Sequence, residues 1–72
     1  MAETREYWDP TLGQHGAYRT IKLYRHRGTW AWRTVGGFMW CRQWGFRSKL
    51  AALRSAGRFY RHCQLVPKRG GA

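Results

Sequence analysis

All three acidic side chains of this 72-residue chain, Glu3, Glu6 and Asp9, lie within its first nine positions. Residues 10–72 contain no carboxylate side chain, although the chain carries fourteen lysines and arginines and a formal net charge of +11. The basic side chains therefore have almost no acidic partners within the chain, and we expect them to face water, phosphate, lipid headgroups or acidic protein. Eleven of the fourteen are arginines, which favour planar and bidentate contacts.

A chain of 72 residues forms at most one domain, and a domain of this size buries too little surface to be very stable. Disulfides and metals are the usual supports of such domains, but Cys41 and Cys63 have no close Cys–Cys or Cys–His spacing. We therefore predict a single small subunit, residues 1–72, with no independent globular core and with support from a large partner.

The hydrophobic periodicity and the positions of glycine and proline predict a small, mainly α protein. Residues 1–28 show no sustained period of two or 3.6 and predict an extended or irregular arm, in which residues 17–27 slightly favour a short helix. Residues 29–66 predict one or two helices rich in aromatic and basic residues. Residues 67–72 contain a proline and two glycines and predict a flexible tail.

Two helices are predicted within this central region. Thr29 is a candidate N-cap for a helix that begins at Trp30, and Gly36-Gly37 weakens that helix by about 1 kcal/mol per glycine relative to alanine. The stronger prediction is a helix over about residues 45–65, where serine and alanines suit helix propensity or packing.

On a helical wheel, this second helix has an apolar stripe beside a basic stripe. The apolar stripe consists of Phe46, Leu50, Leu53, Gly57 and Tyr60. The basic stripe consists of Arg47, Arg54, Arg58 and Arg61. A solvated surface normally mixes charges of both signs, whereas this stripe has no acidic residue beside it. We therefore predict that its four arginines, together with Arg42, contact lipid headgroups or phosphate.

Residues 28–46 are long enough to be considered as a membrane span, but Arg33 and Arg42 interrupt them. An arginine near a helix centre costs roughly 2.5–3.5 kcal/mol on insertion scales. The two arginines argue against a conventional transmembrane span. They are compatible with a place at the membrane interface, where tryptophan and tyrosine lie at headgroup depth and arginine meets lipid phosphate.

No enzymatic chemistry is indicated by the sequence. His62 is adjacent to Cys63, but neighbours on a helix point about 100° apart and no carboxylate lies nearby to complete a nucleophilic site. The histidines and cysteines match no zinc spacing, and the glycine pairs lack the context of a phosphate-binding loop. We predict no catalytic residue, metal, cofactor or small-molecule substrate.

The remaining signature is the interleaving of basic and aromatic residues, which fits two kinds of partner. Arginine and lysine can neutralise phosphates while tryptophan and tyrosine stack on unpaired bases, so ribosomal RNA is one candidate. Alternatively, the tryptophans anchor in grooves of a protein and the arginines pair with its acids or with lipid phosphate.

A short motif adds a resemblance to a known family. Residues 31–38, Ala-Trp-Arg-Thr-Val-Gly-Gly-Phe, resemble the Ala-Trp-Arg, two variable residues, Gly-Gly-Phe segment of the B-twelve-type small accessory subunits of mitochondrial complex I. Residues 43–46, Gln-Trp-Gly-Phe, are similar to the Trp-Gly-Phe near the start of that family's membrane helix. That family carries Asp-Pro-Trp before the motif and a membrane helix after it. This chain instead has Arg-Gly-Thr-Trp at residues 27–30 and a basic amphipathic helix.

The resemblance implies a noncatalytic subunit on the membrane arm that docks through the motif. The predicted docking residues are those of the motif and the neighbouring tryptophan anchors: Trp30, Trp32, Arg33, Gly36, Gly37, Phe38, Trp40 and Trp44. The leading interpretation is an accessory subunit of a mitochondrial inner-membrane respiratory complex, acting in its assembly and stability. Its partners would be other subunits and anionic lipid such as cardiolipin. The alternative is a small basic rRNA-binding protein of a mitochondrial or organellar ribosome.

Overall fold

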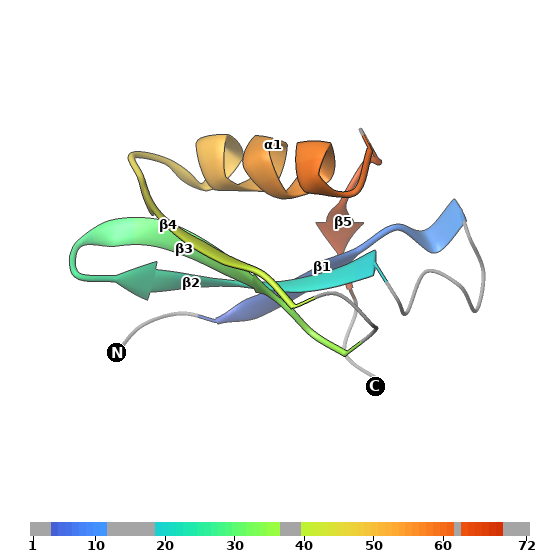
Figure 1. Ribbon diagram of the computed structural model, residues 1–72, viewed down its shortest axis with the longest axis horizontal. Helices are drawn as coiled ribbons and strands as arrows, with labels where there is room; N and C mark the ends of the chain where they lie inside the picture. Colours follow the sequence, from blue (N-terminus) through green and yellow to red (C-terminus); the bar gives the residue numbers. More distant parts are fainter. Residues whose placement is uncertain (1–3, 12–18, 37–39, 62, 69–72) are drawn as a thin grey trace.

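The chain forms a five-stranded antiparallel sheet with a helix packed on one face (Figure 1). The computed structural model describes residues 4–11, 19–36, 40–61 and 63–68. The elements are β1 (Arg5–Trp8), β2 (Thr20–His26), β3 (Thr29–Thr34), β4 (Arg42–Phe46), α1 (Lys49–Phe59) and β5 (Val66–Pro67). The order in the sheet is β4-β3-β2-β1-β5, so α1 carries the chain across the sheet from one edge to the other.

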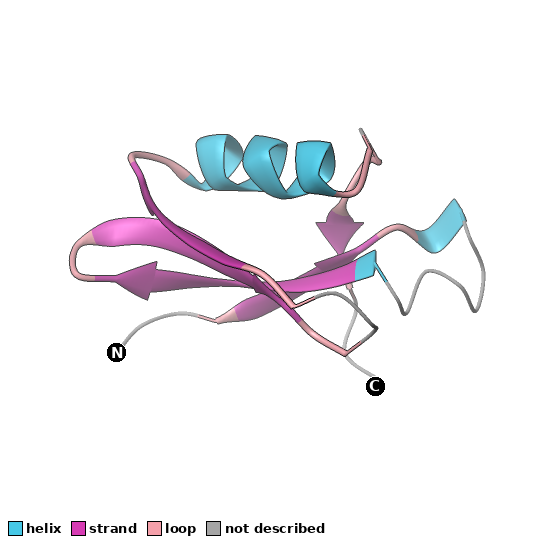
Figure 2. Cartoon of the chain, in the orientation of Figure 1, coloured by secondary structure: helices cyan, strands magenta, loops and turns pink. Residues whose placement is uncertain are grey.

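The prediction of a mainly α protein with an irregular N-terminal arm is wrong. Residues predicted as an arm form β1 and β2, and the helix predicted from Trp30 is strand β3 (Figure 2). The reason lies at Arg27-Gly28, where φ angles of 51° and 77° make a tight two-residue turn between His26 and Thr29. Positive φ at both central positions matches the twist of a β-hairpin, so the turn pairs β2 with β3 and keeps Thr29 from capping a helix.

β2 has the alternation expected of a half-buried strand, but an aromatic residue on its outer face hides it. Ile21 and Leu23 are buried beneath the helix, whereas Lys22 and Tyr24 point to the other face and are only partly buried. Tyr24 places an aromatic ring among the polar positions of residues 20–26. The sequence of this segment therefore shows no clear alternation of polar and apolar residues. Register and burial together define the two faces of the sheet.

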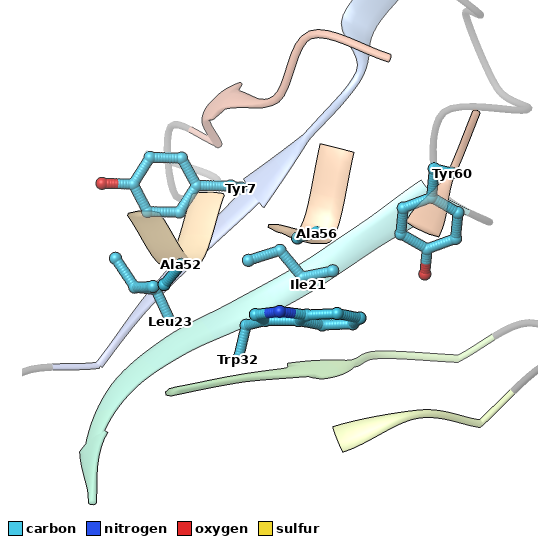
Figure 3. Packing of buried hydrophobic residues seen from close by; sticks show 7 residues of the cluster. All are labelled: Tyr7, Ile21, Leu23, Trp32, Ala52, Ala56 and Tyr60. Atoms are coloured by element: carbon cyan, nitrogen blue, oxygen red, sulfur yellow. The ribbon is translucent and has the colours of Figure 1, made fainter. Parts of the chain in front are cut away.

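A compact core lies between the sheet and α1, so the prediction that the chain lacks a core of its own is also wrong. The core residues are Tyr7, Ile21, Leu23, Trp32, Ala52, Ala56 and Tyr60 (Figure 3). Trp32 is 1% exposed, and its indole Nε1 donates a hydrogen bond of 3.2 Å to Ser55 Oγ on the helix. Its ring also lies 5.3 Å from that of Phe59. Trp32 thereby ties β3 to α1.

The second predicted helix exists but is shorter than expected. Gly45 and Phe46 belong to β4, and α1 begins at Lys49 after Ser48, whose side chain caps the helix by accepting a hydrogen bond from the backbone N–H of Ala51. At the other end, Arg61 has φ of 59°, a left-handed conformation that a right-handed helix does not continue.

Replacement of Ser48 by alanine tests this cap. The variant is expected to lower the free energy of unfolding by about 1 kcal/mol, because one backbone N–H of the first turn loses its acceptor. Chemical denaturation followed by circular dichroism measures the change. Ser48→Asp supplies another capping oxygen and should keep most of the stability, whereas equal losses in both variants would contradict the capping role.

The buried face of α1 differs from the predicted stripe. Ala52 and Ala56 are fully buried, while Leu50, which was assigned to the apolar stripe, is 56% exposed. Small residues face inward because the large ring of Trp32 already fills the space beneath the helix. Because leucine is more hydrophobic than alanine, the sequence pattern predicted that Leu50 would be buried. The face that is actually buried carries Ala52 and Ala56.

Among the residues that the structure describes, no helix is both long and apolar enough to cross a bilayer. This agrees with the prediction drawn from Arg33 and Arg42.

Candidate nucleic-acid interface

The face of the sheet opposite α1 carries basic and aromatic side chains, and no helix of the described residues covers it (Figure 1). Side chains alternate along each strand, and residues opposite one another in register share a face. Since Tyr7, Ile21, Leu23 and Trp32 lie under the helix, the intervening residues occupy the other side. We call this side the open face.

Three cations lie in a row across the open face. Lys22 on β2 is in register with Arg33 on β3, which is in register with Arg42 on β4. Neighbouring strands are about 4.8 Å apart, so the row spans about 10 Å. Like charges directly opposite one another destabilise a sheet. The row therefore has an electrostatic cost that a bound polyanion would relieve.

Acidic groups do little to offset this row. Glu6 on β1 is in register with Lys22 at one end of the row. The buried Asp9 carboxylate accepts hydrogen bonds from the backbone N–H and hydroxyl of Thr11. These are the acidic residues within the described ranges, so Arg33 and Arg42 face each other without a carboxylate beside them. The Arg33 guanidinium donates one hydrogen bond to the Thr34 carbonyl oxygen, at 3.4 Å. A guanidinium has five N–H donors, so this bond uses one of them.

A β-bulge in β4 puts Trp44 and Phe46 on opposite faces of the sheet. Trp30 pairs with Phe46 and Trp32 pairs with Gln43, so Trp44 and Gly45 together oppose a single residue of β3. Gly45 has φ of 93°, which side-chain-bearing residues rarely adopt, and it absorbs the extra residue. As a result both Arg42 and Trp44 point to the open face, while Phe46 returns to the helix side.

Aromatic rings extend from Trp44 toward β2. The Trp44 ring lies 5.8 Å from His26, and His26 lies 6.4 Å from Tyr24. Trp44 is 55% exposed, and the Arg42 guanidinium lies 5.3 Å from the centre of its ring. The group thus combines an accessible ring with an adjacent cation, the pair of features that binds unpaired bases and phosphate.

A second ring and cation lie toward the other edge of the sheet. Trp8 follows Tyr7 on β1, so it points away from the helix, and the Lys68 ammonium lies 5.5 Å from its ring centre. The backbone N–H of Lys68 donates to the Glu6 carbonyl oxygen at 2.9 Å, which fixes this segment beside β1.

The predicted docking residues do not form one surface. Trp32 is a core residue, and Trp30 lies on the helix side between the cations of Arg25 and Lys49, at 4.8 and 5.1 Å from its ring. Trp40 is 75% exposed in the connection from β3 to β4. Of the predicted set, Arg33 and Trp44 share the open face.

The glycine half of the predicted motif is only partly described. Gly36 adopts φ of 71° in the bend after β3, so its role is a chain reversal and no helix is kinked there. Gly37 and Phe38 lie outside the described residues.

The predicted lipid or phosphate contacts are divided between two sides of the molecule. Arg42 is on the open face, whereas Arg54 and Arg58 lie on the solvent side of α1. Arg47 and Arg61 are exposed just before and just after the helix. The predicted basic stripe is therefore exposed as expected, but it is separate from the row on the sheet.

The cysteines lie near Tyr60 and form no disulfide. Burial raises the pKa of the Cys63 thiol, and the negative charge of Asp9 raises it further. Burial also raises the pKa of the Tyr60 hydroxyl, which has no hydrogen-bond partner within the described structure. At neutral pH the Cys63 thiol is consequently protonated, which is the less nucleophilic form. The described residues contain no cluster of three metal-binding side chains.

The predicted docking and phosphate-contact residues leave out four residues of β1 and β2 that complete the open face: Trp8, Lys22, Tyr24 and His26. The sequence does alternate at Thr20, Lys22, Tyr24 and His26. This alternation identifies one face of a strand only when the turn at Arg27-Gly28 and the strand register are known.

Comparison with known proteins gives no relative: no family model matches the chain, and no curated protein or solved structure matches it.

Proposed function

We propose that this protein binds nucleic acid through the open face of its sheet. The observation that carries the proposal is the row of Lys22, Arg33 and Arg42 beside the exposed ring of Trp44, on a face that no described helix covers. Cations contribute most of the affinity of nucleic-acid binding by neutralising phosphates, and arginine does so with two parallel hydrogen bonds.

The aromatic residues give the surface a second means of contact. Every base offers a flat face, so Trp44 and Tyr24 could stack on unpaired bases while the cation row holds the backbone. A duplex could use the same row, because the major groove is about 12 Å wide and admits β-strands. Single strands and duplexes share the phosphate chemistry, and binding experiments with each distinguish between them. The ribosomal RNA predicted as the alternative partner belongs to this class.

The accessory role in mitochondrial complex I, with its inner-membrane location, stays a prediction. Its motif-based docking surface is weakened by burial, because Trp32 is a core residue and Ala31 is fully buried as well. Arg33 is the motif residue that the open face presents outward. We therefore place nucleic-acid binding first.

Charge-neutralising substitutions test the proposal. Lys22→Gln, Arg33→Gln and Arg42→Gln are each expected to weaken binding to labelled single-stranded RNA, single-stranded DNA and duplex DNA. Each should also reduce the slope of log affinity against log salt by about 1, because one phosphate contact is lost. Fluorescence anisotropy across a salt series measures both quantities. Trp44→Ala should weaken single-stranded binding by about tenfold, through loss of one stacked base.

Matched controls come from the helix side. Arg54→Gln and Arg58→Gln remove the same charge from exposed positions of α1 and should leave the slope almost unchanged. If they weaken binding as much as Arg33→Gln does, the interaction is diffuse attraction to a basic protein and the open face is not the site. A Trp44→Ala loss confined to single strands would identify unpaired bases as the ligand, and an equal affinity for duplex would identify a groove.

A further inference from the structure

A groove runs along α1 on the side of the molecule away from the open face. It has a volume of about 580 Å³ and lies between the helix and the C-terminal segment. Its lining residues are Leu50, Leu53, Arg54, Gly57, Arg58, Cys63, Gln64, Leu65 and Val66. Gly57 allows the close approach of the two walls, because a Cβ at this position would lie 2.9 Å from the Cys63 carbonyl oxygen.

The floor of the groove is apolar and accessible. Leu50 is 56% exposed, and the partly buried Leu53 and Leu65 line the groove beside it. Three leucine side chains gathered in a groove differ from the single exposed apolar residues found on most surfaces. Covering such a patch with a partner removes apolar surface from water and is therefore favourable.

The rim of the groove is cationic. Arg54 and Arg58 are both exposed and stand four residues apart, so they lie one above the other on α1, about 6 Å apart along its axis. None of the described residues that line the groove is acidic. The exposed guanidinium groups of Arg54 and Arg58 therefore favour an anionic occupant, and the leucines beside them favour one with an apolar face.

We infer that this groove binds an acidic amphipathic segment of another protein, in helical form. An amphipathic helix places apolar side chains three and four residues apart into a groove, and carboxylates spaced by one turn would meet Arg54 and Arg58. The groove follows α1 from Leu50 to Arg58, about 12 Å along the helix axis, which suits a second helix lying beside it. This inference goes beyond the proposed function and is independent of it, since Leu50, Arg54 and Arg58 lie on α1, whereas Lys22, Arg33, Arg42 and Trp44 lie on the open face.

The test uses a synthetic helical peptide of about 15 residues, long enough to be partly helical alone. Leucines occupy one face and glutamates flank them. One comparison peptide has the same composition in scrambled order, and another carries lysine in place of each glutamate. The full-length protein is titrated with each labelled peptide, and anisotropy reports binding. We expect the acidic amphipathic peptide alone to bind.

Substitutions then locate the contact. Leu50→Gln and the double variant Arg54→Gln/Arg58→Gln are expected to weaken peptide binding at least tenfold. Both groups of side chains are exposed, so the fold should persist, as circular dichroism can verify. The double variant Arg33→Gln/Arg42→Gln removes the same charge from the open face and should bind the peptide normally. Leu50→Gln should in turn leave nucleic-acid binding unchanged.

Several results would overturn the inference. These are absence of peptide binding, equal binding of the scrambled peptide, insensitivity to Leu50→Gln, or equal weakening by the open-face double variant. If single-stranded RNA displaces the peptide from the folded Arg33→Gln/Arg42→Gln variant, the groove is a nucleic-acid site. Binding to phosphatidylserine vesicles without binding to the peptide would assign it to lipid. Failure of nucleic-acid binding alone would leave the peptide result standing, because it concerns the other surface.

Discussion

Trp32→Ala is expected to lower the free energy of unfolding by about 3–5 kcal/mol, the usual cost of removing a large buried ring. The indole is 1% exposed, packs against the helix and donates its N–H to Ser55. Small domains have total stabilities of about 5–15 kcal/mol, so the variant should lie close to the unfolding threshold. Urea denaturation followed by circular dichroism measures the loss.

The control is another tryptophan. Trp40 is 75% exposed, so Trp40→Ala should change stability by less than about 0.5 kcal/mol. Trp32→Phe keeps an aromatic ring but lacks the donor to Ser55, and it should fall between the wild type and Trp32→Ala. A Trp32→Ala loss no greater than that of Trp40→Ala would mean that the sheet does not pack against α1 through this ring.

Gly57→Ala is expected to destabilise the protein by about 1–3 kcal/mol, the usual cost of overpacking. Helix propensity alone gives the opposite sign, because alanine is favoured over glycine within a helix by about 1 kcal/mol. The new Cβ would lie 2.9 Å from the Cys63 carbonyl oxygen, and backbone must move to admit it. Thermal and urea unfolding both report the sign.

Arg58→Ala is the matched substitution one residue further along α1. Its side chain is exposed, so stability should change by less than about 0.5 kcal/mol. An increase in stability for Gly57→Ala would show that propensity outweighs the contact and that the C-terminal segment can move away from the helix. The same variant should narrow the groove, so peptide binding and stability can be compared in one protein.

The helix and the outward direction of the charges were predictable from local chemistry. Ser48 and the alanines after it favour a helix by propensity and capping, and the loss of acids after Asp9 predicts that arginines face outward. These signals need no knowledge of distant neighbours. The helix ends differ from the prediction because Gly45 belongs to a bulge and Arg61 turns left-handed.

The sheet was not predictable in the same way, because its evidence is distributed along the chain. Trp32 looks like a docking residue until Ala52 and Ala56 cover it from a segment about 20 residues later. Tyr24 and Trp44 are twenty residues apart in the sequence, and only the register of β2, β3 and β4 brings them to the same open face. Arg33 and Arg42 are separate charges in the sequence, and strand pairing makes them neighbours.

The bulge at Trp44 and Gly45 also affects how copies of this protein meet. β4 is an outer strand of the sheet, and an outer strand offers backbone donors and acceptors to any extended chain. The extra residue bends this edge and breaks its regular spacing, and Arg42 sets a charge beside it. The bulge and the charge therefore both disfavour in-register extension of the sheet along β4 by a second molecule, and so protect this edge against aggregation.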